Sequence, residues 1–330
     1  MAMGSVNSPP YTVSAKAINL IAEIVELTAH PAMKRMDRMP KMNRVNRIKT
    51  IYSSLAIENN PLSLDQVTDI INGRRILGDS RDIREVKNAY CCYEHLFDYN
   101  PYSSADLLSA HSMMMDSLMD DAGHYRSTGV GVFAGKELIH MAPPADLVPG
   151  HIDNLLKWLE SSDDHPLIKS CVFHYEFEFI HPFSDGNGRT GRLWQTVILS
   201  NWKPIFQWVP VESLVYSNRD SYYKAIGDST DLADSSPFID LMLTMIRDAM
   251  LTVVDRSMVC ETGDDGLTQG HRMILELIDS GKLTSIRDAC TTLDFTESAV
   301  RRYLDELKEM GLIRRVGSRK AGHWEGIDGG

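Results

Sequence analysis

Twelve consecutive residues, 181–192, gather the side chains of this chain that could do chemistry. They read HPFSDGNGRTGR and contain a histidine, an aspartate, three glycines and two arginines. Pro182 argues against a helix through the stretch. Gly186 and Gly188 suit a tight turn that brings the backbone close to a ligand. Apolar residues follow Gly188 at helical spacing, so we expect a helix to begin there.

A helix that starts behind a glycine-rich turn presents free backbone N–H groups, which form an anion site. Arg189 and Arg192 lie one turn apart and could both reach a phosphate chain. Asp185 could hold Mg²⁺, which proteins usually bind with one or two carboxylates plus the phosphates of a substrate. His181 could accept a proton near neutral pH. Together these residues indicate a phosphate-binding site with a base beside it.

Two other motifs share parts of this stretch. Its glycines satisfy the dinucleotide-binding pattern GxGxxG, with Glu212 about 20 residues further on. That motif needs a strand before the turn, whereas residues 165–180 have the apolar spacing of a helix. Read as an EF-hand loop, the stretch would place Phe183 at the first ligand and Trp194 where a glutamate is required. A polar loop that caps a helix explains each residue singly, but not the combination.

The stretch resembles the signature HPFx(D/E)GNGRxxR of the Fic family, and every specified position matches. The resemblance implies a mainly helical fold with a small hairpin. It also implies an enzyme, since most known members move AMP from ATP to a protein hydroxyl. ATP would then be the substrate and Mg²⁺ the cofactor, and phosphoryl transfer needs mostly positioning and charge stabilisation.

The same resemblance implies a role for each residue of the signature. His181 would be the base that deprotonates the target hydroxyl. Phe183 would anchor the loop in the core, and Asp185 would bind Mg²⁺ that bridges the α- and β-phosphates. The other residues would bind phosphate: Gly186, Asn187 and Gly188 through backbone N–H groups, Asn187 also at the α-phosphate, Arg189 at the β-phosphate and Arg192 at the γ-phosphate.

A second motif lies upstream, in a helix that Pro61 should end near Asn59. Ser54 and Glu58 are four residues apart and share a face of it. Taken alone, Glu58 would be an ordinary surface carboxylate. However, SxxxEN resembles the inhibitory motif (S/T)xxxE(G/N) of many Fic proteins, whose glutamate pairs with the second arginine of the signature, here Arg192. A carboxylate there would take the place of the γ-phosphate, so ATP would bind in a pose unsuited to transfer.

Residues 130–141 change in character and predict a β-hairpin. The resemblance implies that this hairpin docks a segment of the target protein as an added strand, held by main-chain hydrogen bonds. His140 and Met141 are candidates for that contact. Further on, Tyr222 and Tyr223 open a helix. Adjacent tyrosines usually place one ring in the core, while the resemblance implies that this pair lines the adenine site.

Helices must position these motifs. Apolar spacing predicts helices at 12–29, 63–72, 81–98, 104–119, 146–160, 165–180, from 218 onward, and at 236–255. A basic segment at 34–49 is expected on a solvated helix face, and His174 is expected to be a packed core histidine. Three short helices at 268–279, 284–292 and 296–310 precede strands at 312–316 and 323–325, with Gly311 as a helix cap. That order resembles a winged helix, which some Fic proteins carry at the C-terminus.

The predicted organisation is therefore a disordered N-terminus at 1–11, a helical region with the inhibitory helix at 12–100, and the catalytic domain at 101–260. A linker at 261–266 and the winged-helix-like domain at 267–330 follow. The helix at 296–310 has three basic and four acidic residues, and the turn region after it adds four basic residues. Phosphate contacts need local positive charge, so this domain could bind DNA or, equally, another protein. The family also implies a homodimer.

Composition sets wider limits. The chain has 330 residues with 43% hydrophobic and 24% charged residues, as in an ordinary globular protein of roughly two domains. Its net charge of −11 disfavours the whole chain as a nonspecific nucleic-acid binder. The odd count of five cysteines without CxxC spacing suggests reduced thiols in the cytoplasm. Neither a membrane span nor a signal peptide is evident.

The sequence thus leaves several functions open. The first is a self-inhibited adenylyltransferase that modifies a Ser, Thr or Tyr hydroxyl of a target or of itself. The second is the reverse reaction, in which Glu58 aligns a water that removes AMP from a modified protein. Relatives that transfer phosphate depart from the signature at Asp185 and Gly188-Arg189, which are intact here. The third is a DNA-binding regulator in which the Fic domain is a sensor.

Overall fold

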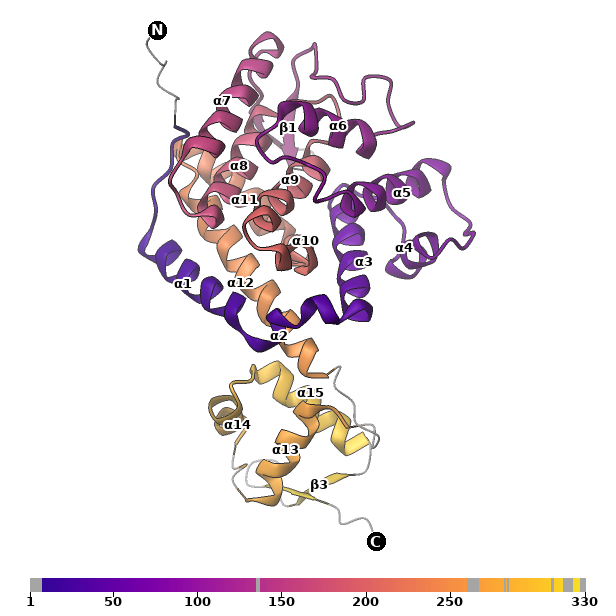
Figure 1. Ribbon diagram of the computed structural model, residues 1–330, viewed down its shortest axis with the longest axis vertical. Coiled ribbons are helices and arrows are strands. Elements are labelled where there is room, and N and C mark those ends of the chain that lie inside the picture. The colour runs from indigo at the N-terminus through magenta and orange to yellow at the C-terminus, as the bar shows by residue number, and fades with distance from the viewer. Residues whose placement is uncertain are drawn as a thin grey trace. The chain divides into compact units, whose positions relative to one another are not determined.

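The computed structural model (Figure 1) describes residues 8–134, 137–259, 267–281, 283, 285–309, 312–316 and 323–326. It divides into two compact units, residues 1–250 and 251–330. The described part of the chain is mainly helical, as predicted. Its small sheets are two antiparallel pairs of strands. Four of the five cysteines, Cys91, Cys92, Cys171 and Cys290, are free thiols, and Cys260 lies outside the described residues.

Helices form most of the first unit, and one pair of strands lies near the middle of its sequence. In chain order its elements are α1 (Ala15–Ala29), α2 (Pro31–Lys34), α3 (Pro40–Ile57), α4 (Leu64–Ile71), α5 (Ser80–Glu94), α6 (Ser104–Met114), β1 (Gly131–Ala134), β2 (Glu137–Met141), α7 (Val148–Ser161), α8 (Pro166–Ile180), α9 (Asn187–Trp202), α10 (Val211–Ser217) and α11 (Arg219–Leu232). Short 3-10 turns lie at Met36–Arg38, Ala145–Leu147 and Pro204–Trp208. α12 (Ser236–Val259) continues from the first unit into the second.

Local sequence signals fix several helix starts. Ser14 caps α1 by accepting a hydrogen bond from the Ala17 N–H. Ser63 and Gln66 form a reciprocal capping box at α4. α6 ends at Met114 rather than at residue 119, because the Asn88 amide of α5 donates to the carbonyls of Met114 and Asp116 and holds the chain in a turn.

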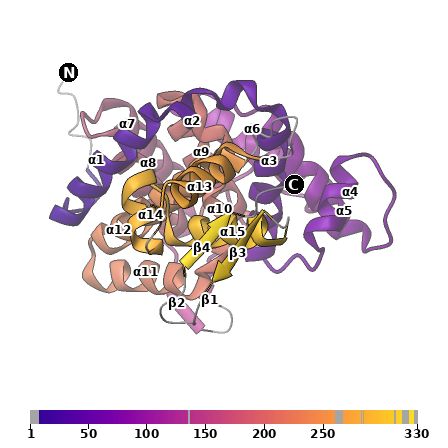
Figure 2. The same ribbon diagram turned by 90° about the horizontal axis from the view of Figure 1, so that it is seen from below.

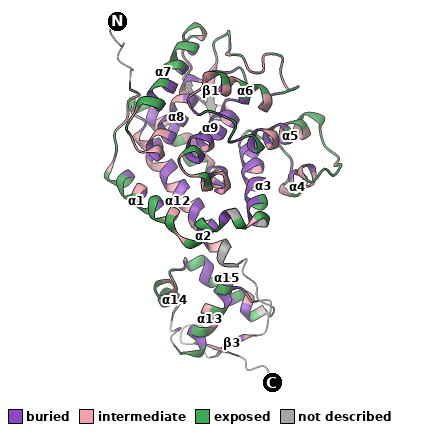
Figure 3. Ribbon diagram, viewed as in Figure 1, coloured by how far each residue is buried: buried purple, intermediate pink, exposed green. Residues whose placement is uncertain are grey.

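α8 and α9 form the centre of the first unit and pack against each other. Figure 3 shows both as almost entirely buried. Phe173, Phe177 and Trp194 are among their fully buried side chains. Because α8 is apolar on nearly all sides, it must be surrounded, whereas an amphipathic helix would cover a surface. The loop between α8 and α9 is therefore held by two rigid helices.

The basic segment at the start of α3 differs from expectation at one position. Arg47 is buried, and its guanidinium lies 4.8 Å from the Trp208 ring and 5.4 Å from the Tyr93 ring. Burial lowers the pKa of Arg47, although the nearby Tyr93 and Glu94 oppose that effect. α3 packs on α10 and the 3-10 turn after α9, whereas the sequence suggested that Arg47 was solvated.

β1 and β2 form the predicted hairpin, with Gly131 opposite Met141 and a register shift between Val132 and Phe133. Residues 135 and 136 lie outside the described part of the chain. β2 lies beside α11 (Figure 2). Met141, at the base of the hairpin, is 64% exposed. No helix of the described residues has the length and apolar character that a membrane crossing requires.

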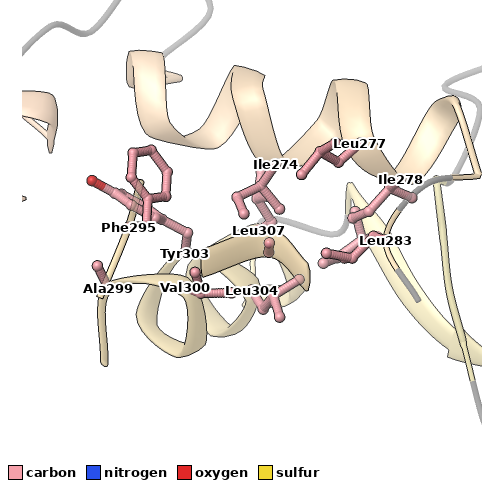
Figure 4. Close-up of a cluster of buried hydrophobic side chains, with 12 residues drawn as sticks. Ile274, Leu277, Ile278, Leu283, Phe295, Ala299, Val300, Tyr303, Leu304 and Leu307 are labelled. Carbon is pink, nitrogen blue, oxygen red and sulfur yellow. The ribbon is translucent and has the colours of Figure 1, made fainter. Parts of the chain in front are cut away.

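The second unit has a core of its own. α13 (Gln269–Asp279), α14 (Ile286–Leu293) and α15 (Glu297–Glu309) precede β3 (Ile313–Val316) and β4 (His323–Gly326), which pair antiparallel. Figure 4 shows Ile274, Phe295, Tyr303 and Leu307 in one buried cluster. Four parts of the predicted organisation lie outside the described residues: residues 1–7, the proposed linker 261–266, the cap Gly311, and residues 317–322 between β3 and β4. The winged-helix assignment stays a prediction.

Several basic side chains of this unit are paired with carboxylates of the same unit. Arg301 contacts Glu297 at 2.5 Å, and Arg314 contacts Glu325 at 3.2 Å. Arg302 lies 3.7 Å from Glu306. Internal pairing reduces the positive charge that these residues can offer to a phosphate backbone. Among the described residues, the positive charge available for DNA binding is thus smaller than the count of arginines suggests.

Candidate active site

The loop from His181 to Gly186 joins α8 to α9 through two left-handed residues. His181 ends α8 at φ 50°, and Gly186 precedes α9 at φ 81°. A side chain at Gly186 would place its first carbon 2.6 Å from Sδ of Met115, so both the backbone angle and the available space require glycine. α9 begins at Asn187, one residue before the predicted start.

Phe183 and Asn187 hold this loop in shape. Phe183 is fully buried, and its ring stacks on the ring of His111 with centroids 3.6 Å apart. The Phe183 N–H donates to Oδ1 of Asn187, and Nδ2 of Asn187 donates to the Phe183 carbonyl, both at 2.8 Å. Phe183 thus lies where an anchor is expected. Both polar side-chain atoms of Asn187 therefore brace the loop.

His111 is a positioning residue that sequence reasoning missed. The Gly123 N–H donates to its Nδ1 at 2.9 Å, so Nε2 carries the proton and donates to the Asp185 carbonyl at 3.0 Å. Burial lowers the pKa of His111 to about 4, although the hydrogen bond to Asp185 opposes this effect. The ring is therefore neutral near pH 7 and holds a single tautomer. A lone histidine in a predicted helix gave no signal of this contact.

Arg126 is the second missed residue, and it is 2% exposed. Its side chain donates to four carbonyls: His181 at 2.7 Å, Thr128 at 2.9 Å, Pro143 at 2.6 Å and Ile180 at 3.2 Å. Its backbone N–H donates to the Pro182 carbonyl at 2.9 Å. Thr128 and Pro143 flank the hairpin, so one guanidinium ties both feet of the hairpin to the start of the loop.

His181 has the geometry of a base. Its Nδ1 lies 3.3 Å from the Glu178 carbonyl, which can only accept, so Nδ1 carries the proton of that contact. Nε2 then holds the lone pair that could take a proton. Its carbonyl is bound by Arg126. The backbone that carries the imidazole is thus fixed from two sides.

Arg192 meets the upstream motif. Its guanidinium is buried and donates from Nη2 to Oε1 of Glu58 at 2.7 Å and to the Ser54 carbonyl at 3.0 Å. Nε donates to Oγ of Ser54 at 3.1 Å. Burial alone would lower the pKa of Arg192, but Glu58, with Tyr222 and Glu178, raises it above its ordinary value. α3 ends at Ile57, which puts the Glu58 carboxylate beside the start of α9.

Glu58 also lies directly against the glycine-rich turn. A methyl group added to Gly188 would collide with Oε1 of Glu58 and lie 2.9 Å from Nη1 of Arg192. The carboxylate therefore lies beside the α-carbon of Gly188, at the N-terminus of α9. Backbone N–H groups there favour an anion. An anionic side chain of the protein itself is held at the place where a phosphate was expected.

Asp185 and Arg189 form the other half of the site. Oδ1 of Asp185 accepts from the Gly186 N–H at 2.6 Å and from Nη2 of Arg189 at 3.1 Å. The Asp185 side chain is 49% exposed, whereas that of Arg189 is 4% exposed. No group of three or more metal-ligating side chains occurs in the described residues. A single half-exposed carboxylate fits a Mg²⁺ ion that takes its other ligands from water and phosphates.

The two tyrosines expected to line the adenine site, Tyr222 and Tyr223, differ in burial. Tyr222 is 2% exposed, and its hydroxyl lies 3.1 Å from Nε2 of His174. His174 is fully buried, as expected, and its Nδ1 lies 2.8 Å from Oε1 of Gln195. Burial lowers the pKa of His174 to about 3, so the ring is neutral. Tyr223 is only partly buried and lies beside the guanidinium of Arg219. Of the pair, Tyr223 is therefore the ring that a ligand could reach.

Comparison with known proteins agrees with the resemblance of the central stretch to the Fic signature. A model of the Fic/DOC family matches residues 101–199. The crystal structure of a Fic family protein from Desulfovibrio desulfuricans G20 is 41% identical, with 98% of this chain and 99% of that one covered and a TM-score of 0.74. Fic-1 from Caenorhabditis elegans shares the fold, with 23% identity, coverage of 73% and 71%, and a TM-score of 0.58.

Curated relatives carry the name of an activity. Protein adenylyltransferase fic-1 of Caenorhabditis elegans is 28% identical over 70% of this chain and 46% of the relative. A probable protein adenylyltransferase of Aquifex aeolicus is 27% identical over 54% of this chain and 53% of the relative. The chain thus spans about half the length of these relatives.

Proposed function

The chain belongs to the Fic family, and from that premise we propose that it is a self-inhibited protein adenylyltransferase. It moves AMP from ATP to a Ser, Thr or Tyr hydroxyl of a target protein or of itself. One observation carries the proposal. The loop and the first turns of α9 hold His181, Asp185 and two buried arginines together, and Glu58 occupies the second arginine, Arg192.

The proposed chemistry gives each of these groups one role. Nε2 of His181 takes the proton of the target hydroxyl as its oxygen attacks the α-phosphorus of ATP. The bond from the α-phosphorus to the bridging oxygen breaks, and pyrophosphate leaves. Backbone N–H groups at Gly186 to Gly188 stabilise the charge on the α-phosphate, and Arg189 and Arg192 orient the β- and γ-phosphates. Asp185 would hold Mg²⁺, which would neutralise phosphate charge.

Inhibition follows from the same site. Arg192 is 2% exposed, and its Nε and Nη2 are bonded to Ser54 and Glu58, so the Glu58 carboxylate competes with the γ-phosphate for this guanidinium until Glu58 moves. The carboxylate also lies against Gly188, where negative charge repels a phosphate. ATP can then enter only with its phosphates displaced from the base. We infer that removing Glu58 frees the site for transfer.

The target segment is proposed to dock on the hairpin at 130–141. β1 and β2 form a two-stranded sheet, and an open strand edge can accept an extended segment by main-chain hydrogen bonds. Arg126 ties the feet of this hairpin to the His181 carbonyl. This contact supports a common frame for the docked hydroxyl and the base.

The proposal is tested by the mass of the intact protein after incubation with ATP and Mg²⁺. We expect Glu58→Gly to gain AMP at least ~10-fold faster than wild type, because Arg192 becomes available to the γ-phosphate. Glu58→Gly with His181→Ala should gain none. Ser54→Ala serves as a matched variant: it removes one neutral hydrogen bond from Arg192 and should raise transfer far less. A Glu58→Gly protein that modifies neither itself nor any protein of a cell extract would overturn the proposal.

A second candidate uses the same site to remove AMP. The Glu58 side chain is 33% exposed, so water can reach the carboxylate beside Arg192. A carboxylate there could align a water for attack on the phosphorus of an AMP-modified side chain, with the side-chain oxygen as the leaving group. Protein modified beforehand by the Glu58→Gly variant distinguishes the two. Release of AMP by wild type, and none by Glu58→Gly, would favour removal.

A further inference from the structure

Helix α5 also reaches the phosphate-binding residues. Arg81 of α5 lies 3.4 Å from Oδ2 of Asp185, and Glu85 lies 3.2 Å from Nη1 of Arg189. Asp185 and Arg189 contact each other at 3.1 Å, and Arg81 and Glu85 do so at 3.8 Å. Four charges of alternating sign therefore form a closed ring. Two come from α5 and two from the signature.

Both pairs are set by helical spacing. Arg81 and Glu85 are four residues apart on α5, as are Asp185 and Arg189 at the start of α9, so each pair lies on one face. α5 is held in place by Asn88, which donates to two carbonyls of the turn after α6. Arg81 itself donates to the Leu118 carbonyl of that turn at 3.2 Å. The hydrogen bonds of α5 to this turn therefore hold Arg81 and Glu85 beside Asp185 and Arg189.

The contacts of Arg189 are incomplete. Its side chain is 4% exposed, yet Nε and Nη1 are buried without a hydrogen-bond partner. Glu85 lies within ion-pair distance of Nη1 but does not have hydrogen-bond geometry. By contrast, Glu58 bonds Arg192 at 2.7 Å with good alignment. Glu85 therefore supplies charge to Arg189 but not hydrogen bonds, which makes it a weaker partner than a phosphate would be.

We propose that α5 is a second inhibitory element, in which Glu85 neutralises Arg189 and Arg81 covers the exposed oxygen of Asp185 until nucleotide and Mg²⁺ displace them. The proposal rests on the function proposed above, which assigns Arg189 to the β-phosphate and Asp185 to the metal. In the resting chain both arginines of the signature then face a carboxylate of the protein. The metal-binding carboxylate faces a guanidinium.

The two inhibitory contacts are linked. Nδ2 of Asn60 donates to Oε2 of Glu85 at 2.8 Å, and Oδ1 of Asn60 accepts from the Leu62 N–H. Asn60 follows Glu58 by two residues in the turn that ends α3. A movement that takes Glu58 off Arg192 therefore also pulls on the carboxylate at Arg189. We expect the release of one contact to weaken the other.

Nucleotide binding tests the proposal without turnover. Glu58→Gly with His181→Ala is the background, and calorimetry measures the Kd for ATP in the presence of EDTA. Adding Glu85→Gln should lower that Kd roughly three- to tenfold, because a neutral amide no longer competes with phosphate for Arg189. Asp98→Asn, at an exposed position in the turn after this helix, is the matched control and should leave the Kd unchanged.

The contact between Arg81 and Asp185 is tested separately, by titrating Mg²⁺ into the same background variant at a fixed ATP concentration. Arg81→Ala should lower the Mg²⁺ concentration for half-maximal nucleotide binding roughly threefold, because a like charge leaves the metal site. Arg84→Ala, an exposed arginine on the same helix that lies near Asp116, is its control.

Opposite or null results overturn the inference. A higher Kd for ATP in Glu85→Gln would mean that Glu85 orients Arg189 for the phosphate. A higher Mg²⁺ requirement in Arg81→Ala would mean that Arg81 is itself a phosphate ligand. Unchanged values in both would mean that the ring is structural only. A background protein that binds no ATP would overturn the proposed function as well, whereas one that binds ATP but ignores α5 would overturn this inference alone.

Discussion

At the scale of single residues, only glycine fits at position 188, because a methyl group added there would collide with the Glu58 carboxylate. In the proposed function this is the anion position. We expect Gly188→Ala, in the Glu58→Gly background, to lower AMP transfer by about 100-fold, because the methyl group fills that position. Gly227→Ala on α11 is the matched control, since nothing lies within 4 Å of a methyl group added there, and it should retain transfer. Equal activity of both variants would remove Gly188 from the anion site.

Glu178 predicts a pH dependence of stability. Its side chain is buried beneath Gly191, and burial raises its pKa from 4.5 to about 7, with Arg192 opposing and Glu58 adding to the shift. The folded chain holds this proton more tightly than the unfolded chain does. The carboxyl therefore adds stability that is fully present below pH 4.5 and is lost as the pH rises through about 7.

Glu178→Gln should not show this loss, because the amide stays neutral. Relative to wild type, its free energy of unfolding should rise by about 3 kcal/mol between roughly pH 4.5 and pH 8. Urea unfolding at the two pH values measures the difference. Glu160→Gln, at an exposed position of α7, should run parallel to wild type. A parallel course for Glu178→Gln would show that the carboxyl is ionised across this range.

At the scale of elements, Arg126 joins the hairpin to the loop from His181 to Gly186. We expect Arg126→Gln, in the Glu58→Gly background, to lower the rate of AMP transfer by about 100-fold while the Kd for ATP stays within about twofold. The lost bonds fix the backbone of His181 and the hairpin, not the phosphate site. Arg126→Lys should recover part of the rate.

The control for Arg126 is Arg247→Gln, which removes an arginine of α12 that pairs with Glu23 and Asp248. It should change neither rate nor Kd. If Arg126→Gln loses ATP binding and transfer together, the loop as a whole has collapsed and Arg126 has no separate positioning role.

Element boundaries show how far local sequence reaches. The helices at 165–180 and 236–255 were predicted close to the observed α8 and α12, because long apolar patterns and capping residues are local signals. The predicted end of α6 at residue 119 was wrong, because Asn88 of α5 stabilises a turn after Met114. A bond between two helices leaves no trace in the periodicity of either one.

At the scale of the whole molecule, the chain has two units with separate cores. The described residues of the second unit bury a cluster of their own, and the residues of the signature, together with Ser54 and Glu58, belong to the first unit. We expect a chain that ends at Val259, with α12 complete, to fold and to retain AMP transfer within about threefold in the Glu58→Gly background. Thermal unfolding and the intact-mass assay measure this. Loss of transfer with the fold intact would assign the second unit a part in the reaction.

The sequence by itself determined the local geometry of the central stretch. The spacing from His181 to Arg192 places a turn, a helix start and two arginines one helical turn apart, because these are consequences of local backbone geometry. The mainly helical fold and the hairpin also followed from local patterns. For the same reason the likeness of Ser54 and Glu58 to an inhibitory motif could be read from six residues.

Only the tertiary structure decided which distant groups meet. Glu58 lies 134 residues before Arg192, and Arg126 lies 55 residues before His181, yet each pair is in contact. His111, Arg126 and the α5 pair Arg81 and Glu85 looked like ordinary residues of their segments. A buried charge or a neutral histidine is stable only where packing supplies its partners, and that packing depends on residues far away in the chain.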